Sequence, residues 1–304
     1  MRRAVLPVMM ALLSGAAANA AGCPKLKAVS LPEVGTSPSL GRQSQAMRSQ
    51  AIQSEAGTAG ITNTDSQPGD RAPAGHLQVV TGIADGAILL SGGERLVPRG
   101  AVIPTRLNPA AELTERAEAA ARALLLGRTL RFAQGERDRH GRHVADAFVQ
   151  GESETLPLSL LLLQAGAAYA DPAAVPACTE ELRAAELRAR QSRAGLWSSA
   201  SAVLSAGDAS AVAARIGLFT LVEGRVRAAN LVLGLLYLNF GSRWRDDVTV
   251  TLSASRAARI PSGGLAPAIL AGTFVRVRGV VNEQGGPLLA LASTAALDFG
   301  EQRQ

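Results

Sequence analysis

The stretch that decides the fold is Asp138-Arg139-His140-Gly141-Arg142, in the middle of a 304-residue chain. Its aspartate and glycine favour a tight turn. Strand-like segments flank it, Thr129–Ala133 on one side and Val144–Val149 on the other. Apolar and β-branched runs bounded by turn residues are typical of β-strands. The sequence therefore predicts a β-hairpin whose turn carries Arg142.

Three helical patterns surround this hairpin. Residues 109–126 repeat apolar side chains at helical spacing and are followed by a glycine, which is typical of a helix end. Residues 156–168 are apolar nearly all round and predict a buried helix. We expect a third helix, capped by Thr179, to run to about Arg193 and to be followed by Gly195-Leu196-Trp197.

Short strands are predicted upstream of the first helix, at residues 77–80, 87–90 and 95–97. The turn-forming runs Asp85-Gly86 and Ser91-Gly92-Gly93 separate them. These segments predict a strand meander at the start of the folded part of the chain.

The order of a meander, a helix, a D-x-x-G-R hairpin, a buried helix and a helix ending in G-L-W resembles the thermonuclease (staphylococcal nuclease) family. The resemblance covers about residues 77–198. Its anchors are the hairpin turn, Leu163-Gln164-Ala165-Gly166-Ala167-Ala168, and Glu181 through Gly195-Leu196-Trp197. It implies a mainly β fold with packed helices (α+β), an OB-type five-stranded barrel, over residues 76–198.

The resemblance also implies a chemistry, calcium-assisted phosphodiester hydrolysis. That reaction needs carboxylates around a hard cation, a glutamate to activate water, and arginines to stabilise the charged transition state. The family segment D-G-D-T corresponds to Ala84-Asp85-Gly86-Ala87, where one aspartate remains, one position out of register.

A second family segment, R-L-x-G-h-D-x-P-E with h apolar, corresponds to Val97–Thr105. Val97, Val102 and Thr105 stand where the family has its first arginine, its metal-binding aspartate and its catalytic glutamate. Only Arg142 matches a catalytic position directly, since Arg95 or Arg99 would need a small insertion. We therefore expect a catalytically degenerate protein with no cofactor, and with calcium only if it is active as a nuclease.

Two further groups of titratable residues are weaker candidates. His140 and His143 lie on the hairpin without a nearby third ligand, which makes a poor zinc site. Glu112, Glu115 and Glu118 follow helical spacing and predict a solvated helix face.

The C-terminal part is strand-like again over residues 215–300, after a small, polar and partly helical linker predicted at 199–214. Leu221–Arg227 and Phe274–Val281 alternate apolar with charged residues, and Val248–Leu252 alternates with threonine. Several short strands with few helices predict a second small, OB-like β-barrel.

Aromatic and arginine side chains are interleaved in this second barrel. Its segment Tyr237–Val250 resembles the small barrel appended to thermonuclease-like proteins of proteobacteria. Barrels of this type hold single-stranded nucleic acid with aromatic rings and guanidinium groups. The alternative is that the aromatics fill the barrel and the arginines face water. The candidate nucleic-acid contacts are Arg99, Arg225, Tyr237, Phe240, Arg243, Trp244, Arg276 and Arg278.

The N-terminus predicts export. Arg2 and Arg3 precede a short apolar run and Ala18-Asn19-Ala20, the pattern of a cleaved signal peptide over residues 1–20. Residues 21–75 are rich in Ser, Gln, Gly, Thr and Pro and predict a disordered leader. We expect a periplasmic or secreted protein without a transmembrane segment in its mature chain.

The two cysteines, Cys23 and Cys178, have two interpretations. In an oxidising compartment they would form a disulfide. Alternatively, Ala20-Ala21-Gly22-Cys23 is a weak lipobox, which would make Cys23 a lipid attachment site.

The charge balance points to an anionic partner. Lys and Arg number 31 against 25 Asp and Glu, a net charge of +6. Such an excess favours nucleic acid or a phospholipid surface. The alternative is a soluble protein with a mild positive charge and no anionic partner. Three hypotheses remain: a degenerate thermonuclease-like protein that binds nucleic acid, another polyanion or an envelope protein; a divergent, active calcium-dependent phosphodiesterase; and a structural envelope protein.

Overall fold

The computed structural model describes Cys23 and residues 75–133, 135–151, 155–243, 246–259 and 267–300. All of them belong to one compact unit, Met1–Pro24 together with Pro73–Gln304. The predicted signal peptide and almost all of the predicted leader lie outside the described residues.

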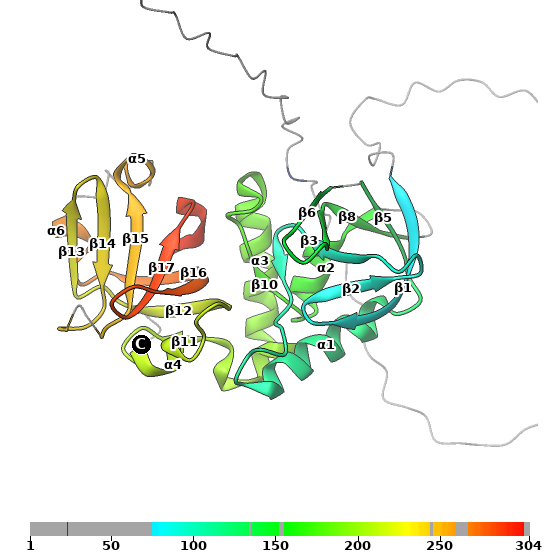
Figure 1. The fold of residues 1–304 in the computed structure, drawn as a ribbon, viewed down its shortest axis with the longest axis horizontal. Coiled ribbons are helices and arrows are strands. Elements are labelled where there is room, and N and C mark those ends of the chain that lie inside the picture. The colour runs from blue at the N-terminus through cyan, green and yellow to red at the C-terminus, as the bar shows by residue number, and fades with distance from the viewer. Residues whose placement is uncertain are drawn as a thin grey trace, which may run out of the picture. The chain divides into compact units, whose positions relative to one another are not determined.

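The N-terminal sheet closes on itself (Figure 1). Its strand order is β6-β7-β3-β2-β1-β5-β8-β9. One residue, Asp146, separates β7 from β8, so these two strands form one bent segment that pairs in parallel with β3 and antiparallel with β5. The five segments β1, β2, β3, β7–β8 and β5 thus form a ring, as expected of an OB-type barrel. The strands are β1 (His76–Ala84), β2 (Ala87–Leu90), β3 (Arg95–Pro98), β5 (Thr129–Phe132), β6 (Glu136–Arg137), β7 (His143–Ala145), β8 (Ala147–Gln150) and β9 (Thr155–Pro157), with β4 (Ala101–Val102) and β10 (Tyr169–Ala170) paired separately.

The predicted hairpin is present in two parts. The flanking segments pair as β5 with β8, while the turn that carries Arg142 is closed by the short pair β6 and β7. Gly141 takes a positive φ of 71° in this turn, a backbone conformation that glycine adopts without strain.

Three helices pack with this sheet: α1 (Ala111–Leu125), α2 (Leu158–Gln164) and α3 (Thr179–Gln191). Thr179 is the first residue of α3 and not its cap; its hydroxyl donates to the Pro176 carbonyl at 2.8 Å. Helix α2 ends before Gly166, whose backbone lies against Ala194 and Gly195 so closely that a Cβ would collide with the Ala194 carbonyl. This backbone contact explains why the L-Q-A-G and G-L-W motifs occur together.

The segment predicted as a linker is part of the packed fold. It contains η3 (Ala200–Ala202), β11 (Leu204–Ser205) and α4 (Ala209–Ala213), and β11 pairs in parallel with β12. The Asp208 side chain caps α4 by accepting from the Ala211 amide at 3.0 Å, and Val212 is fully buried. Small alanine and serine side chains are typical of linkers, but here they fit a tightly packed corner.

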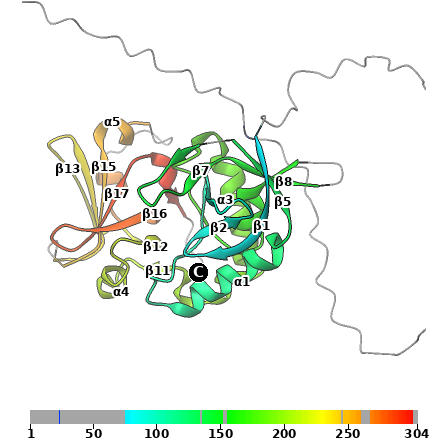
Figure 2. The same ribbon diagram turned by 45° about the vertical axis from the view of Figure 1, so that its right-hand side comes forward.

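Figure 2 shows the C-terminal sheet, whose strand order is β11-β12-β16-β17-β15-β14-β13. Strand β15 pairs in parallel with β17, and only Val226 and Arg227 separate β12 from β13, so the sheet ends meet. The ring runs through β12–β13, β14, β15, β17 and β16, again consistent with an OB-like barrel. The elements are β12 (Phe219–Arg225), β13 (Ala228–Val232), β14 (Leu235–Asn239), β15 (Thr249–Ser253), β16 (Phe274–Glu283), β17 (Pro287–Leu291) and β18 (Leu297–Phe299), with α5 (Ala254–Ala257), α6 (Pro267–Leu270) and η4 (Thr294–Ala296).

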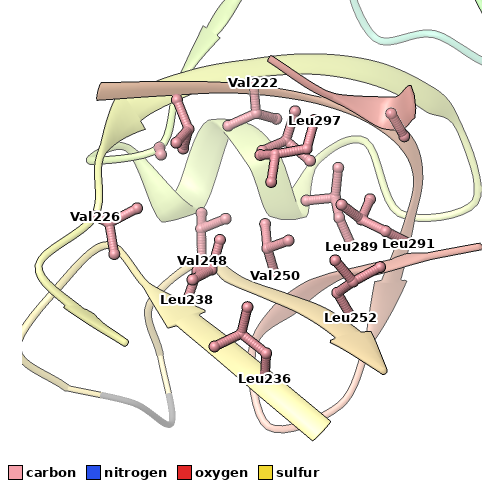
Figure 3. Close-up of a cluster of buried hydrophobic side chains, with 14 of the residues drawn as sticks. Val222, Val226, Leu236, Leu238, Val248, Val250, Leu252, Leu289, Leu291 and Leu297 are labelled. Carbon is pink, nitrogen blue, oxygen red and sulfur yellow. The ribbon is translucent and has the colours of Figure 1, made fainter. Parts of the chain in front are cut away.

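Each sheet encloses an apolar core. Figure 3 shows the C-terminal core, where valine and leucine side chains from opposite strands meet, among them Val222, Leu238 and Leu289. A separate cluster joins Leu221 of β12 to Leu113, Tyr169 and Trp197. Because Leu221 belongs to the C-terminal sheet, apolar packing continues from one sheet to the other.

Two 3-10 helices flank α3, η1 (Pro176–Cys178) before it and η2 (Gly195–Ser198) after it. Among the described residues, no helix has the length and apolar content needed to cross a bilayer.

Candidate functional site

The structure brings together, at the β1–β2 turn, three segments for which the sequence resemblance predicts catalytic residues. Asp85 occupies this turn with a positive φ of 48°. A Cβ on Gly86 would lie 2.9 Å from the Ile103 carbonyl and 3.0 Å from the Thr105 side chain, so the turn needs glycine to approach residues 103–105. The third segment is the hairpin, since Arg142 Nη1 donates to the Asp85 carbonyl at 3.3 Å.

The Arg142 guanidinium is held by Asp138. Its Nε and Nη2 both lie 2.7 Å from Asp138 Oδ2, and each side chain is 20% exposed. Burial alone would raise the pKa of Asp138, but hydrogen bonds from the Arg142 amide and guanidinium lower that pKa overall. Arg142 therefore connects the hairpin turn to the β1–β2 turn.

The donor set at this place does not fit a calcium ion. Ala87 is buried in β2, Val102 is half-buried in β4, and neither carries an oxygen on its side chain. Thr105 offers a neutral hydroxyl, and its Oγ1 has no hydrogen-bond partner within the described part of the chain. Calcium needs six to eight oxygen ligands with several carboxylates. The described residues contain no group of three Asp, Glu, His or Cys that could hold a metal.

A buried carboxylate that the sequence pattern did not predict lies beside this site. Glu118 is not on a solvated helix face: its side chain is 8% exposed and faces Arg122 Nη2 at 3.5 Å. Arg106 Nε lies 3.9 Å from Glu118 Oε1 and also 3.9 Å from Asp85 Oδ1. The two carboxylates near the site thus face guanidinium groups. The i,i+4 spacing of Glu118 and Arg122 was the one available signal.

The other two glutamates of that helical pattern differ from Glu118. Glu112 accepts a hydrogen bond from Ser199 at 2.6 Å, and Glu115 is exposed.

The two hairpin histidines do not act together. His143 is 3% exposed, and its Nε2 lies 3.1 Å from Glu94 Oε1, while His140 is exposed in the turn. Burial alone would raise the pKa of Glu94, but hydrogen bonds from His143 and Gln78 lower it. His143 is therefore part of a structural polar cluster under the sheet.

A cleft of about 780 Å³ lies elsewhere, between α3 and the strands β16 and β18. Phe299, 44% exposed, lines it together with the hydroxyl side chains Thr179, Ser293 and Thr294. Five arginines line the same cleft: Arg183, Arg190, Arg259, Arg276 and Arg278.

Carboxylates hold these arginines in place. Glu223 Oε1 lies 2.7 Å from Arg190 Nη2 and 2.5 Å from Arg276 Nε. Burial alone would raise the pKa of Glu223, but the hydrogen bonds from Arg190 and Arg276 lower it. The carboxylate therefore stays ionised and fixes the two guanidinium groups to each other.

A second ion-pair cluster lies deeper in the cleft wall. Arg278 Nη2 lies 2.9 Å from both Glu186 Oε2 and Asp298 Oδ2. Arg183 pairs with Asp298 and donates to the Ala295 carbonyl at 2.9 Å. The Glu186 side chain is 3% exposed and that of Arg183 is 26% exposed, so Arg183 is the more accessible of the two at the cleft.

Arg278 departs from its predicted role as a surface contact. It is 2% exposed, and its Nε and Nη1 have no hydrogen-bond partner among the described residues. Its charge instead holds β16 to Glu186 of α3. The expectation that alternating arginines on this strand all face outward is therefore corrected by burial against α3, although Arg276 is 25% exposed at the cleft.

The remaining predicted contacts do not gather at this cleft. Arg99 lies between β3 and β4, and Arg225 ends β12, where its Nη1 donates to the Gly272 carbonyl at 2.7 Å. Tyr237 is half-buried on β14, and Phe240 packs against the C-terminal core. The last two are Arg243, which is exposed after β14, and Trp244, which lies outside the described residues.

Sequence analysis also missed the contribution of α3. Arg183, Glu186 and Arg190 are spaced i, i+3 and i+7, which places them on one helix face. The spacing is visible in the sequence, but the sequence does not show that β16 lies opposite this helix face.

The two cysteines are joined. Cys23 and Cys178 form a disulfide with a Cα–Cα distance of 4.9 Å, inside the usual range for such bonds. The bond fixes residue 23 to the start of α3, as the disulfide interpretation requires.

Comparison with known families places a defined domain in this chain. The family described as staphylococcal nuclease homologues matches residues 98–199, from the end of β3 through η2. The fold and this match show a staphylococcal-nuclease-like domain with mixed helices and strands. No curated protein matches the chain.

Proposed function

We propose that this protein is an exported, thermonuclease-like protein that has lost phosphodiester hydrolysis and binds nucleic acid or a related polyanion. The observation that carries the proposal is the cleft beside α3, whose lining includes the more exposed arginines Arg183, Arg190, Arg259 and Arg276. Its place of action would be the periplasm or the cell exterior, as the N-terminal pattern predicts.

The chemistry of the family positions supports the loss of hydrolysis. Val102 and Thr105 stand where the family has the aspartate that holds the cation and the glutamate that activates water. Each such group contributes to stabilising charge in the transition state, so their joint absence removes most of the rate enhancement. The Arg142 guanidinium is already paired with the Asp138 carboxylate, which gives it a structural role.

The geometry of the cleft supports binding. Guanidinium groups recognise phosphate oxygens through paired hydrogen bonds. Arg276 and Arg259 offer positive charge at its wall, and Phe299 offers an aromatic face on which a base can stack. Three hydroxyl side chains add donors for phosphate or sugar oxygens.

Fluorescence anisotropy with labelled single-stranded DNA and RNA tests the binding, using the chain from residue 22 onward. We expect affinity that falls as salt rises, because phosphate contacts release counterions. Arg259→Gln with Arg276→Gln should weaken binding about tenfold and reduce the salt slope by about 2. Arg188→Gln, on the exposed side of α3, is the matched control and should change little.

Two results would overturn this proposal. Cleavage that requires calcium and stops with chelator would restore the nuclease hypothesis, and Arg142→Ala would then have to abolish it. Absence of salt-dependent binding to any of the nucleic acids would favour a structural role in the envelope.

A further inference from the structure

The tip of the β13–β14 hairpin exposes an unusual amount of apolar surface. Leu231 is 55% exposed, Val232 51%, Leu233 100% and Leu235 39%. We call these four residues the hairpin tip. Scattered surface leucines are ordinary in soluble proteins, but a contiguous apolar group indicates an interaction site.

The backbone conformation of the turn indicates that the fold does not require a leucine at position 233. Leu233 and Gly234 form a two-residue connection with φ values of 48° and 79°. Such turns favour Asn-Gly or Asp-Gly, because asparagine and aspartate tolerate a positive φ better than leucine does. Leu233 thus combines backbone strain with complete exposure, and strained positions of this kind cluster at functional sites.

The backbone of the tip is prepared for an apolar surrounding. Strand pairing continues to the last cross-strand pair, Val232 with Leu235. The Gly234 carbonyl accepts from the Ala254 amide of α5 at 2.8 Å. Figure 1 shows α5 beside this end of the hairpin. Unpaired backbone groups are costly in hydrocarbon, so internal pairing favours insertion.

The apolar side chains surround the tip on all sides. Leu231 faces the same side of the hairpin as Leu236, while Val232 and Leu235 face the opposite side, and Leu233 forms the apex. Ile269 of α6, which is 63% exposed, extends the apolar surface beside β13. A partner groove would contact one side, whereas a lipid surface is apolar around the whole apex.

The charge near the tip fits anionic headgroups. Arg256 is exposed on α5, two residues from the amide that bonds Gly234. The described residues of β13, β14, α5 and α6 contain no carboxylate. Asp246 and Asp247 lie in the loop at the opposite end of β14. Basic residues beside an apolar insertion are typical of proteins that bind anionic bilayers.

We propose that the hairpin tip docks this protein on an anionic phospholipid bilayer, with Leu233 entering the headgroup–acyl boundary and Arg256 meeting lipid phosphates. The four residues of the hairpin tip do not line the arginine-lined cleft. The protein would then hold its polyanion-binding cleft near a membrane surface.

Vesicle sedimentation tests the proposal with the chain from residue 22 onward. The probes are vesicles of phosphatidylcholine alone and of phosphatidylcholine with about 30% phosphatidylglycerol, which gives the surface a negative potential. We expect binding to the anionic vesicles, at least tenfold weaker in Leu233→Asn. Because Asn-Gly suits the turn, this variant should unfold at the same or a higher temperature, which separates lost docking from lost folding.

Control variants assign the effect. Leu107→Asn replaces an 83% exposed leucine before α1 and should bind vesicles like the wild type. Arg256→Gln should weaken binding to anionic vesicles alone. Nucleic-acid affinity should be unchanged in Leu233→Asn, so failure of the docking and failure of the proposed function are distinguishable.

Three outcomes would overturn the docking proposal: no sedimentation of the wild type, undiminished binding by Leu233→Asn, or self-association of the wild type that Leu233→Asn abolishes. The last would assign the tip to a second copy of the chain.

Discussion

At the scale of single residues, Arg142 connects two turns of the fold. Its guanidinium joins the Asp138 carboxylate and the Asp85 carbonyl, both part of turns that shape the site. A side chain with such contacts contributes to stability whether or not a phosphate is present.

We predict that Arg142→Ala destabilises the protein by about 1–3 kcal/mol, because Asp138 loses its charged partner in a half-buried place. Urea unfolding followed by fluorescence of the buried Trp197 measures the change. Arg139→Ala, in the same turn, is the control and should cost far less. Equal stabilities of the two variants would show that the contact between Arg142 and Asp138 contributes nothing to the free energy of unfolding.

Buried charges are the residues that sequence analysis placed least well. Glu118 and Arg278 occur in polar patterns that predict exposure, since glutamate and arginine are seldom buried without a partner. Glu118 has one local partner, Arg122 at i,i+4. Its other partner, Arg106, and the partners of Arg278, Glu186 and Asp298, lie on other elements. Only the tertiary fold creates those pairs, so no local pattern could reveal them.

At the scale of elements, α3 links the two sheets through its charged face. Arg190 of α3 and Arg276 of β16 share the Glu223 carboxylate of β12. One side chain therefore joins three elements, and its ionisation should matter to their association.

We predict that this carboxylate makes stability fall in acid. The folded pKa of Glu223 is lowered, so its contribution is complete above the unfolded value near 4.5 and is lost as the pH falls through the lower, folded pKa. Glu223→Gln should cost about 1–3 kcal/mol at pH 7 and less in acid. Urea unfolding from pH 7 down to pH 3 measures how the free energy of unfolding changes with pH in the wild type and in Glu223→Gln.

Glu115→Gln is the control for this experiment, since Glu115 is exposed on α1. It should leave the pH profile unchanged. A Glu223→Gln profile parallel to that of the wild type would contradict the prediction.

Elements were predictable where their patterns are local. The helices α1 and α3, the first three strands and the alternating strand β16 follow from periodicity and turn residues. The packing of segment 199–214 was not predictable, because its alanines and serines carry almost no periodic signal. Asp208, which caps α4, is the one local helix signal in this segment. The parallel pairs β3 with β7 and β15 with β17 join distant segments, which a local pattern cannot specify.

At the scale of the whole molecule, two rings of the same strand order are packed into one compact unit. Leu221 contributes to the cluster that contains Tyr169 and Trp197, and the Tyr169 hydroxyl donates to the Ala202 carbonyl at 2.9 Å. Burial raises the pKa of Tyr169, which keeps this hydroxyl protonated as a donor. The segment between the sheets thus acts as a packed joint, and we expect the two sheets to unfold together.

The disulfide between Cys23 and Cys178 should add stability to this unit. It closes a loop over a sequence separation of 155 residues. By the chain-entropy model, such a loop restricts the unfolded chain by about 5 kcal/mol, an upper value because natural gains are often smaller. We predict that Cys178→Ser lowers the melting temperature measured by calorimetry, and that Cys23→Ser lowers it equally, because either change removes the same bond.

Intact mass before and after reduction gives an independent check, with a gain of about 2 Da expected for one disulfide and a far larger mass for a lipid at Cys23. Unequal effects of the two serine variants would mean that the cysteines act separately, and the lipid interpretation of Cys23 would replace the disulfide.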